Sequence, residues 1–375
     1  MDDFPTRIQV QLEAQKSRGL DRQTRVVPEN WRDFTSNDYL GLARSEELRD
    51  SIRDFLSRSS SGRNGSGGSR LLSGNSTLAE ETEGFLATIS GAECGLLFSS
   101  GYMANLGVLS CLPQRGDTVL YDEHAHASLK DGIRLSLANR YSFRHNDMDD
   151  LERKLRRSKG IVFIVAESVY SMDGDLCPLA DLVAVAQRRN AVIVLDEAHG
   201  TGVFGDDGGG LATSLGLEKK IPVRILTFGK AMGIHGACVC CTKPVRNYVV
   251  NFSRPFIYTT AMPDHSLAAI RCSFEFLRQH HDLRDTLTNK IALFRQHYAS
   301  HTGSTTAIQP VIIGGNEKTR AAAVTLQSRG YDVRPVLSPT VRPGTERLRI
   351  CLHVFNSDED VVGLARELAV VGSTQ

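Results

Sequence analysis

The sequence has almost no net charge, and it contains no long hydrophobic run. Its 44 Lys and Arg residues nearly balance 43 Asp and Glu residues, which leaves a formal charge of +1. Proteins that bind nucleic acids or membrane surfaces depend on an excess of positive charge, so we expect neither partner. No apolar stretch approaches the roughly 18 residues that cross a bilayer, and the N-terminus lacks a basic-then-apolar signal pattern. We therefore expect a cytoplasmic protein.

The eight cysteines are scattered through a chain of 375 residues, without the density of a disulfide-rich protein. Cys94, Cys111 and Cys351 have apolar neighbours in the sequence, which favours reduced, buried thiols over a disulfide framework. Cys238 and Cys241 have the CxxC spacing that redox and metal sites use. Because they lie in an apolar run typical of a buried strand, we expect both to belong to the hydrophobic core.

Short apolar runs alternate with amphipathic stretches between residues 90 and 245. The clearest runs are 161–165, 192–195 and 224–226, and their continuous hydrophobicity suits strands that are buried on both faces. Residues 178–189 place their apolar side chains on one helical face, so the first two strands and this helix form a βαβ unit. The alternation predicts an α/β fold with a mainly parallel sheet flanked by helices.

The length suggests more than one domain. At roughly 150 residues per domain, the chain would form two to three domains, or one large α/β unit with an appendage. After Pro263 the pattern changes to longer helices and then to a short tail rich in strands. We expect an N-terminal segment over 1–45, a large domain over 46–265 and a smaller α+β domain over 266–375.

Two predicted strands end in residues that can carry chemistry. Asp196 and His199 follow the strand at 192–195, and Lys230 follows the strand at 224–226. Ligands of open α/β sheets bind at the carboxyl ends of strands, so these three side chains should line a cleft. A lysine that is partly removed from water can lose its proton and form a Schiff base with an aldehyde such as that of pyridoxal phosphate.

Two further segments suit a phosphorylated aromatic cofactor. Residues 99–105 connect a predicted strand to a helix, and a turn of small residues at a helix N-terminus presents free N–H groups to a phosphate. His126 follows another strand and offers a flat ring that can stack on an aromatic cofactor.

Each of these segments also has a simpler interpretation. The DEAH run at 196–199 occurs in helicases too, but a helicase needs a GxxxxGK[ST] phosphate loop, and the sequence has none. Asp196 could cap a loop, and Lys230 could be an ordinary surface lysine. Many strand-to-helix turns resemble the one at Ser99. His124 and His126 have a spacing that suggests a metal site, although the sequence places no third ligand.

Six spaced motifs follow one another along the chain: residues 62–70, 99–102, 126–128, 167–174, 196–200 and 227–230. Their order resembles that of the α-oxoamine synthases. These are fold-type I pyridoxal-phosphate enzymes, related in fold to aspartate aminotransferase, which condense an amino acid with an acyl-CoA. The resemblance covers about residues 35–265 and continues more weakly into the C-terminal domain.

The resemblance implies pyridoxal 5'-phosphate as the cofactor and gives roles to individual residues. Lys230 would form the Schiff base, and Asp196 would pair with the pyridinium nitrogen and keep it protonated, so that the ring draws electrons from the substrate. His126 would stack on the ring, and His199 would lie beside its hydroxyl. The other implied cofactor contacts are Gly101, Tyr102, Glu167, Ser171, Thr227, Thr259 and Thr260.

The resemblance also implies a homodimer and a substrate site. Thr259 and Thr260 resemble a segment that reaches the phosphate bound by the neighbouring subunit. Asn37 and Arg349 would bind substrate, with Arg349 holding the carboxylate of the amino acid through its guanidinium. Arg347 is the alternative if the strand register differs by one alternation.

Within the family, residues 68–75 and the Gly236-Ala237 pair most resemble the branch that joins L-alanine to pimeloyl-CoA, or to the pimeloyl thioester of a carrier protein. That reaction gives 8-amino-7-oxononanoate, CoA and CO2 in biotin biosynthesis. The alternatives are a glycine acetyltransferase and a serine palmitoyltransferase. A catalytically silent scaffold of the same fold is a fourth hypothesis. Ala79 stands where many relatives carry a histidine, so acyl or CoA contacts inferred from those relatives do not transfer to this region.

Overall fold

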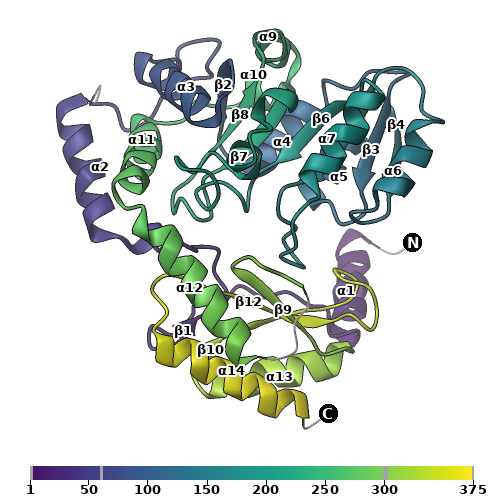
Figure 1. Cartoon of the computed structure of the whole chain (residues 1–375), viewed down its shortest axis with the longest axis vertical. Coiled ribbons are helices and arrows are strands. Elements are labelled where there is room, and N and C mark those ends of the chain that lie inside the picture. Colours follow the sequence, from purple (N-terminus) through teal and green to yellow (C-terminus); the bar gives the residue numbers. More distant parts are fainter. Residues whose placement is uncertain (1–2, 60–61, 299–302, 374–375) are drawn as a thin grey trace.

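The computed structural model describes residues 3–59, 62–298 and 303–373, and the chain forms a larger and a smaller part (Figure 1). The larger part is built on a seven-stranded sheet, in which β8 runs antiparallel to both of its neighbours and the five strands from β7 to β4 run parallel. This confirms the prediction of a mainly parallel sheet. In spatial order the strands are β2 (Cys94–Phe98), β8 (Ala237–Cys241), β7 (Val223–Thr227), β6 (Val192–Asp196), β5 (Val162–Glu167), β3 (Thr118–Asp122) and β4 (Asn139–Phe143).

Helices cover both faces of this sheet, which explains why its strands are apolar throughout. In β6, Val194 packs with residues of α4 and α5, whereas Ile193 and Leu195 pack on the opposite face with residues of α6 and α7. The predicted βαβ unit is confirmed, since α7 connects β5 to β6. The helices of the larger part are α2 (Glu46–Ser59), α3 (Thr77–Ser90), α4 (Gly101–Leu109), α5 (Ala127–Leu135), α6 (Met148–Leu155), α7 (Leu179–Arg188), α8 (Leu211–Ser214), α9 (Lys243–Phe252), α10 (Arg254–Ile257) and α11 (Asp264–Gln279).

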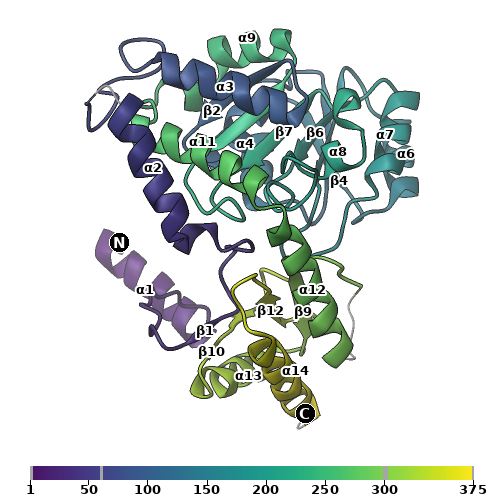
Figure 2. The same ribbon diagram turned by 60° about the vertical axis from the view of Figure 1, so that its left-hand side comes forward.

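The smaller part combines a short antiparallel sheet with three helices (Figures 1 and 2). Its strands lie in the order β11 (Arg334–Val336), β12 (Arg347–Cys351) and β9 (Ile308–Ile312). The N-terminal segment joins this part, because β1 (Arg32–Asp33) pairs with β10 (Tyr331–Asp332). The helices are α12 (Asp282–His297), α13 (Asn316–Ser328) and α14 (Asp358–Ser373), and α1 (Phe4–Ser17) lies beside them. The described residues also include 3-10 turns at Leu42–Arg44 and Glu218–Lys220.

The domain boundaries at residues 45 and 265 stay predictions, and residues 1, 2, 374 and 375 of the outer segments lie outside the described residues. Helix α11 contacts α2 and α3 of the larger part, whereas α12 contacts α14 of the smaller part. We therefore propose that the second boundary lies in the short connection between α11 and α12. Within the described ranges, no helix is long and apolar enough to cross a membrane.

The cysteines are largely buried, as the sequence predicted. All eight thiols are free, and seven of them are buried. Cys238 and Cys241 belong to different hydrophobic clusters, because residues three apart in a strand point to opposite faces. The CxxC spacing therefore does not create a site here.

Candidate active site

The carboxyl ends of three adjacent parallel strands bring the strand-end residues together. Glu167 ends β5 and Asp196 ends β6, and the two are register partners. Lys230 follows β7 in the turn after Thr227. Each residue comes from a different sequence motif, and the parallel sheet places all three at one edge, as expected for strand-end residues.

A chain of hydrogen bonds runs from Lys230 to the N-terminal segment. Lys230 Nζ lies 2.7 Å from His199 Nε2, and His199 Nδ1 lies 2.8 Å from the hydroxyl oxygen of Tyr39. Tyr39 donates its hydroxyl hydrogen to Asn37 Oδ1 at 3.1 Å. The pattern fits a neutral His199 that accepts from Lys230 at Nε2 and donates from Nδ1.

Burial lowers the pKa of both basic groups of this hydrogen-bond chain, Lys230 and His199. It lowers the pKa of Lys230 to about 8, although Asp196 and Glu167 act in the opposite direction. Burial also holds the pKa of His199 well below its ordinary value, and the positive charge of Lys230 adds to this effect. Lys230 thus loses its proton far more readily than an exposed lysine does, as an amine nucleophile or base requires.

Asp196 is a buried carboxyl group with two fixed partners. Its Oδ2 accepts from Asn105 Nδ2 at 2.6 Å, and its Oδ1 accepts from the Ala198 backbone N–H at 2.8 Å. Asn105 also donates to Ser128 Oγ, which lies 2.8 Å from His126 Nδ1. The network fixes the carboxyl group of Asp196 and links it through Asn105 and Ser128 to the ring of His126.

Glu167 is the second buried carboxyl group of the site. Burial, together with the nearby charge of Asp196, raises the pKa of Glu167 to about 8, so Glu167 keeps its proton more readily than an exposed glutamate does. Its Oε1 accepts from the His126 backbone N–H at 2.6 Å, at the start of α5. Glu167 thereby fixes the position of His126, whose side chain is exposed and free to meet a flat ligand.

The N-terminus of α4 forms a cradle for an anion. The first N–H groups of a helix have no partner inside it, and here Ser100 Oγ caps only the Met103 N–H. Thr227 Oγ1 is buried and has no hydrogen-bond partner within the described residues. A Cβ atom at Gly101 would lie only 2.3 Å from this oxygen, so the close approach requires glycine. These features fit a phosphate group.

The side chain of Tyr102 is engaged elsewhere, so a contact between Tyr102 and this cradle would involve its backbone. Its side chain is exposed, and its hydroxyl donates to Asp131.

The two candidate arginines of β12 have different surroundings. Arg349 donates to Asn37 Oδ1 at 3.0 Å and to the Ser171 carbonyl oxygen at 2.5 Å, so it joins the chain that starts at Lys230. Arg347 is buried and pairs with Asp173. The geometry favours Arg349 over Arg347 as the arginine that faces a substrate. Ser171 meets this group through its carbonyl oxygen.

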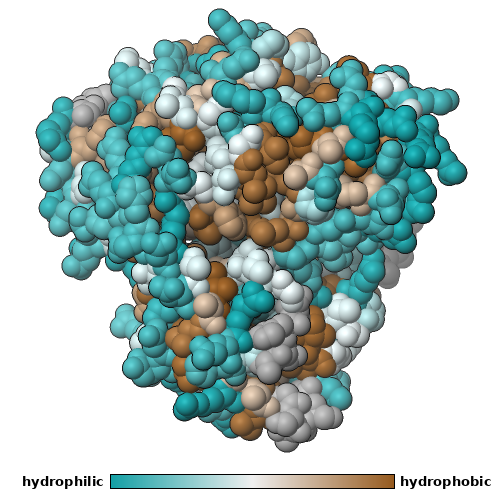
Figure 3. All heavy atoms as spheres, viewed as in Figure 1, coloured by the Kyte–Doolittle hydropathy of each residue, from teal (hydrophilic) through white to brown (hydrophobic). Residues whose placement is uncertain are grey.

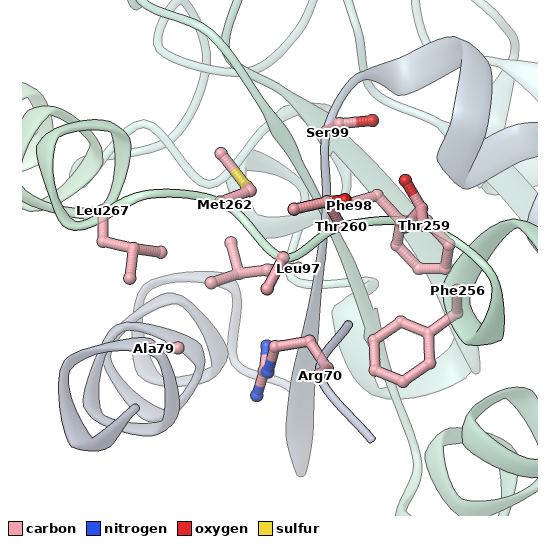
Figure 4. A pocket seen from close by; sticks show the side chains of 11 residues that line it. Arg70, Ala79, Leu97, Phe98, Ser99, Phe256, Thr259, Thr260, Met262 and Leu267 are labelled. Atoms are coloured by element: carbon pink, nitrogen blue, oxygen red, sulfur yellow. The ribbon is translucent and has the colours of Figure 1, made fainter. Parts of the chain in front are cut away.

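Thr259 and Thr260 lie apart from this cluster. They line a cavity of about 20 Å³ with Ser99 and Arg70, and Figure 4 shows Ala79 of α3 and Leu267 of α11 on its other side. Among the described residues, neither threonine has a side-chain hydrogen bond to the cluster around Lys230. A role toward a neighbouring subunit stays a prediction.

The structure adds three residues to the site that the sequence did not single out. Tyr39 connects His199 to Asn37, and Asn105 and Ser128 connect Asp196 to His126. Asn105 and Ser128 lie inside segments that the sequence had already marked, and Tyr39 lies two positions after Asn37. In the sequence, each is only an uncharged polar residue close to a candidate residue. Such residues are too common to predict a site contact by themselves.

Residues 29–366 match the family described as aminotransferase class I and II. The chain is 41% identical to 8-amino-7-oxononanoate synthase of Emericella nidulans over 374 residues, which cover 93% of this chain and 91% of that protein. It is also 41% identical to 8-amino-7-oxononanoate synthase of Methylococcus capsulatus, over 90% of this chain and 88% of that one.

Solved structures of the same fold agree. Serine palmitoyltransferase of S. paucimobilis, with bound PLP and myriocin, superposes with a TM-score of 0.90 at 26% identity, covering 100% of this chain and 99% of that chain. 8-Amino-7-oxononanoate synthase of Francisella tularensis superposes with a TM-score of 0.78 at 27% identity, covering 92% and 98%.

Proposed function

Because the chain belongs to the class I and II aminotransferase family, we propose that it is a pyridoxal-phosphate-dependent acyltransferase that condenses L-alanine with a pimeloyl thioester. The products are 8-amino-7-oxononanoate, CO2 and the free thiol carrier. The observation that carries the proposal is the meeting of Lys230, Asp196 and an anion cradle at one edge of the sheet. Identity of 41% to synthases of this reaction supports the choice of substrates.

The residues present fit pyridoxal phosphate. Lys230 would hold the cofactor through its amine, and the N-terminus of α4 with Thr227 would hold the phosphate. Asp196, oriented by Asn105, would hold a proton on the ring nitrogen, and His126 would lie against the ring face. When bound, the cofactor stabilises negative charge on the α-carbon of the amino acid.

The protein then supplies orientation and proton transfer. Arg349 would bind the carboxylate of L-alanine beside Asn37, as a guanidinium suits a planar carboxylate. Lys230, with its lowered pKa, would take the α-proton, and neutral His199 at 2.7 Å would keep the amine in place. Glu167 and Ser171 would complete the cofactor site.

We also propose that the protein works as a homodimer, in which Thr259 and Thr260 reach the phosphate site of the partner subunit. Large side chains near this segment are exposed in the single chain: Tyr258 is 74% exposed and Leu72 is 85% exposed. Figure 3 shows hydrophobic residues gathered over the centre of the large part, where a second subunit would cover them. A cytoplasmic location stays a prediction.

The first test is a near-ultraviolet and visible absorbance spectrum of the protein loaded with pyridoxal phosphate, recorded during titrations with L-alanine, glycine and L-serine. We expect a cofactor band that L-alanine perturbs at the lowest concentration. Lys230→Ala should lose or alter this band and lower the turnover of L-alanine with pimeloyl-CoA by about 10³-fold or more.

Other outcomes would favour the alternatives. The tightest response to L-serine, with product from a long-chain acyl-CoA, would favour a serine palmitoyltransferase, the activity of the structural relatives at 26% identity. The tightest response to glycine would favour a glycine acetyltransferase. Absence of any band after incubation with the cofactor would contradict the proposal and favour a silent scaffold.

A further inference from the structure

Tyr39 is a buried tyrosine that connects the proposed substrate arginine to the histidine beside Lys230. The residue is 1% exposed. Its hydroxyl oxygen lies 2.8 Å from His199 Nδ1, 3.1 Å from Asn37 Oδ1 and 3.5 Å from Arg349 Nη2. A single hydroxyl group therefore meets both the residues that would hold the substrate carboxylate and the ring that contacts the catalytic amine.

The direction of the hydrogen bonds in this group follows from Arg349. A guanidinium group can only donate, so the Asn37 atom that lies 3.0 Å from Arg349 Nη2 has to be the oxygen Oδ1 and not the amide nitrogen. This oxygen can only accept, and it lies 3.1 Å from the Tyr39 hydroxyl oxygen. The one hydrogen of the Tyr39 hydroxyl is thus used in the bond to Asn37.

Tyr39 is then left as an acceptor toward His199. The bond of 2.8 Å between them requires that His199 Nδ1 carries the hydrogen. Burial and the positive charge of Lys230 hold the pKa of His199 well below its ordinary value, so the ring has one hydrogen and Nε2 has a free lone pair. Lys230 Nζ, at 2.7 Å from Nε2, has to donate to it.

The position of the hydrogen on His199 matters for the chemistry of Lys230. A neutral amine has one lone pair, and it takes a proton from a substrate through that lone pair. If His199 carried its hydrogen on Nε2, this N–H would donate to Lys230 and occupy the lone pair. With the hydrogen on Nδ1, the lone pair stays free, and Nε2 offers an acceptor to the ammonium group that proton transfer creates.

We propose that Tyr39 is a positioning residue that holds the hydrogen of His199 on Nδ1 and thereby keeps the lone pair of Lys230 free for the α-proton. The inference rests on the proposed function, in which Lys230 removes that proton. It also connects the two ends of the site, because the arginine that would bind the carboxylate sets the donor direction at the base.

The experiment compares Tyr39→Phe with Tyr331→Phe. Tyr331 is another buried tyrosine, and it lies in β10 of the smaller part under the guanidinium group of Arg32. Nitrogen-15 NMR of cofactor-free protein labelled at histidine reports which ring nitrogen carries the hydrogen, and His199→Gln identifies the signals of His199. Thermal denaturation checks that each variant is folded.

We expect His199 to carry its hydrogen on Nδ1 in the wild type and in Tyr331→Phe. In Tyr39→Phe the buried Nδ1–H group would have no acceptor, so the hydrogen should move to Nε2. A wild type with the hydrogen on Nε2 would overturn the proposal. So would a folded Tyr39→Phe variant that keeps the hydrogen on Nδ1.

Steady-state kinetics of the cofactor-loaded enzyme test the consequence for Lys230. In Tyr39→Phe, kcat should fall by about tenfold or more. The KM for L-alanine should change by less than about threefold, because Arg349 keeps its bond to Asn37. A variant that changes the KM alone would contradict a role through Lys230.

The pKa of Lys230 distinguishes positioning from a loss of packing. The pH dependence of the rate at which cofactor-free protein combines with pyridoxal phosphate measures this pKa, which burial lowers to about 8. With an N–H group of His199 directed at the amine, the ammonium form loses its acceptor, so the pKa should fall further in Tyr39→Phe. Water that enters a loosened site would raise the pKa instead, and this result would contradict the proposal. Both variants keep the other titratable groups that act on Lys230, namely Asp196, Glu167, Arg349, Cys351 and His126.

Product formation separates this inference from the proposed function. A wild-type enzyme that forms 8-amino-7-oxononanoate while His199 carries its hydrogen on Nε2 would refute only the role of Tyr39. A hydrogen on Nδ1 that depends on Tyr39, in a protein that forms no product, would refute only the proposed reaction.

Discussion

Two histidines of the larger part, His199 and His145, show how neighbours decide the charge of a buried ring. Burial holds the pKa of His199 well below its ordinary value, and the positive charge of Lys230 lowers it further. Burial would also lower the pKa of His145, but hydrogen bonds to Asp122 at 2.9 Å and Asp175 at 2.8 Å raise it to about 10. One ring is neutral and the other is a cation at neutral pH.

The difference separates a site prepared for chemistry from a structural cluster. This cluster consists of His145, Asp122, Asp175, His124 and Tyr170 and is called the His145 clamp. Around Lys230, the basic groups lose protons readily and can exchange them with a substrate. Around His145, the charges are paired and the rings are packed: His124 stacks on His145 with ring centroids 4.0 Å apart, and Tyr170 meets its edge at 4.5 Å. Asp175 belongs to the turn that carries Ser171, so the clamp holds a wall of the site.

Among the variants described below, Asp196→Asn should have the largest effect, because it changes the charge of the cluster around Lys230. The substitution keeps the shape but removes the charge that would hold a proton on the cofactor, so we expect kcat to fall by about 10²-fold or more. It should also lower the pKa of Glu167 and of Lys230, since Asp196 raises both. Steady-state kinetics and the pH dependence of the absorbance band measure these effects.

Asp181→Asn provides a matched control for that variant, because Asp181 is an exposed residue in the first turn of α7. Its kinetics should equal those of the wild type. Wild-type kcat in Asp196→Asn would contradict the role proposed for Asp196.

Arg349→Lys should produce a smaller effect that is confined to substrate binding. A lysine keeps the charge but loses the planar fork, so we expect the KM for L-alanine to rise by about tenfold with a smaller change in kcat. Arg347→Lys should lower the melting temperature instead, because Arg347 is buried against Asp173. The reverse pattern, with the KM effect in Arg347→Lys, would show that the other arginine of β12 binds the carboxylate.

Residues that follow a strand could be predicted from the sequence. Asp196 and His199 follow the apolar run at 192–195, Lys230 follows the run at 224–226, and the rule that parallel strands end at one edge brings them together. Glu167 was named only through the family resemblance. The strands β5, β6 and β7 lie within one or two residues of their predicted limits, since continuous burial leaves a continuous apolar pattern.

Contacts between distant segments could not be worked out from local patterns. Tyr39 reaches His199 across 160 positions, and Arg349 reaches Asn37 across 312. Such pairs depend on how the smaller part packs against the sheet, which the spacing of residues does not encode. The family resemblance supplied Asn37 and Arg349, but Tyr39 and the His145 clamp came only from the structure.

Loss of the charge on His145 should change the free energy of unfolding more than the activity. A folded pKa of about 10, above the ordinary 6.5, means that protonated His145 stabilises the fold. This stabilisation is complete below pH 6.5 and is lost as the pH rises through about 10. We expect His145→Asn to lower the free energy of unfolding by about 2 kcal/mol at pH 6, with a smaller difference from the wild type at pH 10. Urea denaturation at both values measures it. A difference that grows with pH would mean that the ring is neutral, and the contrast with His199 would then fail.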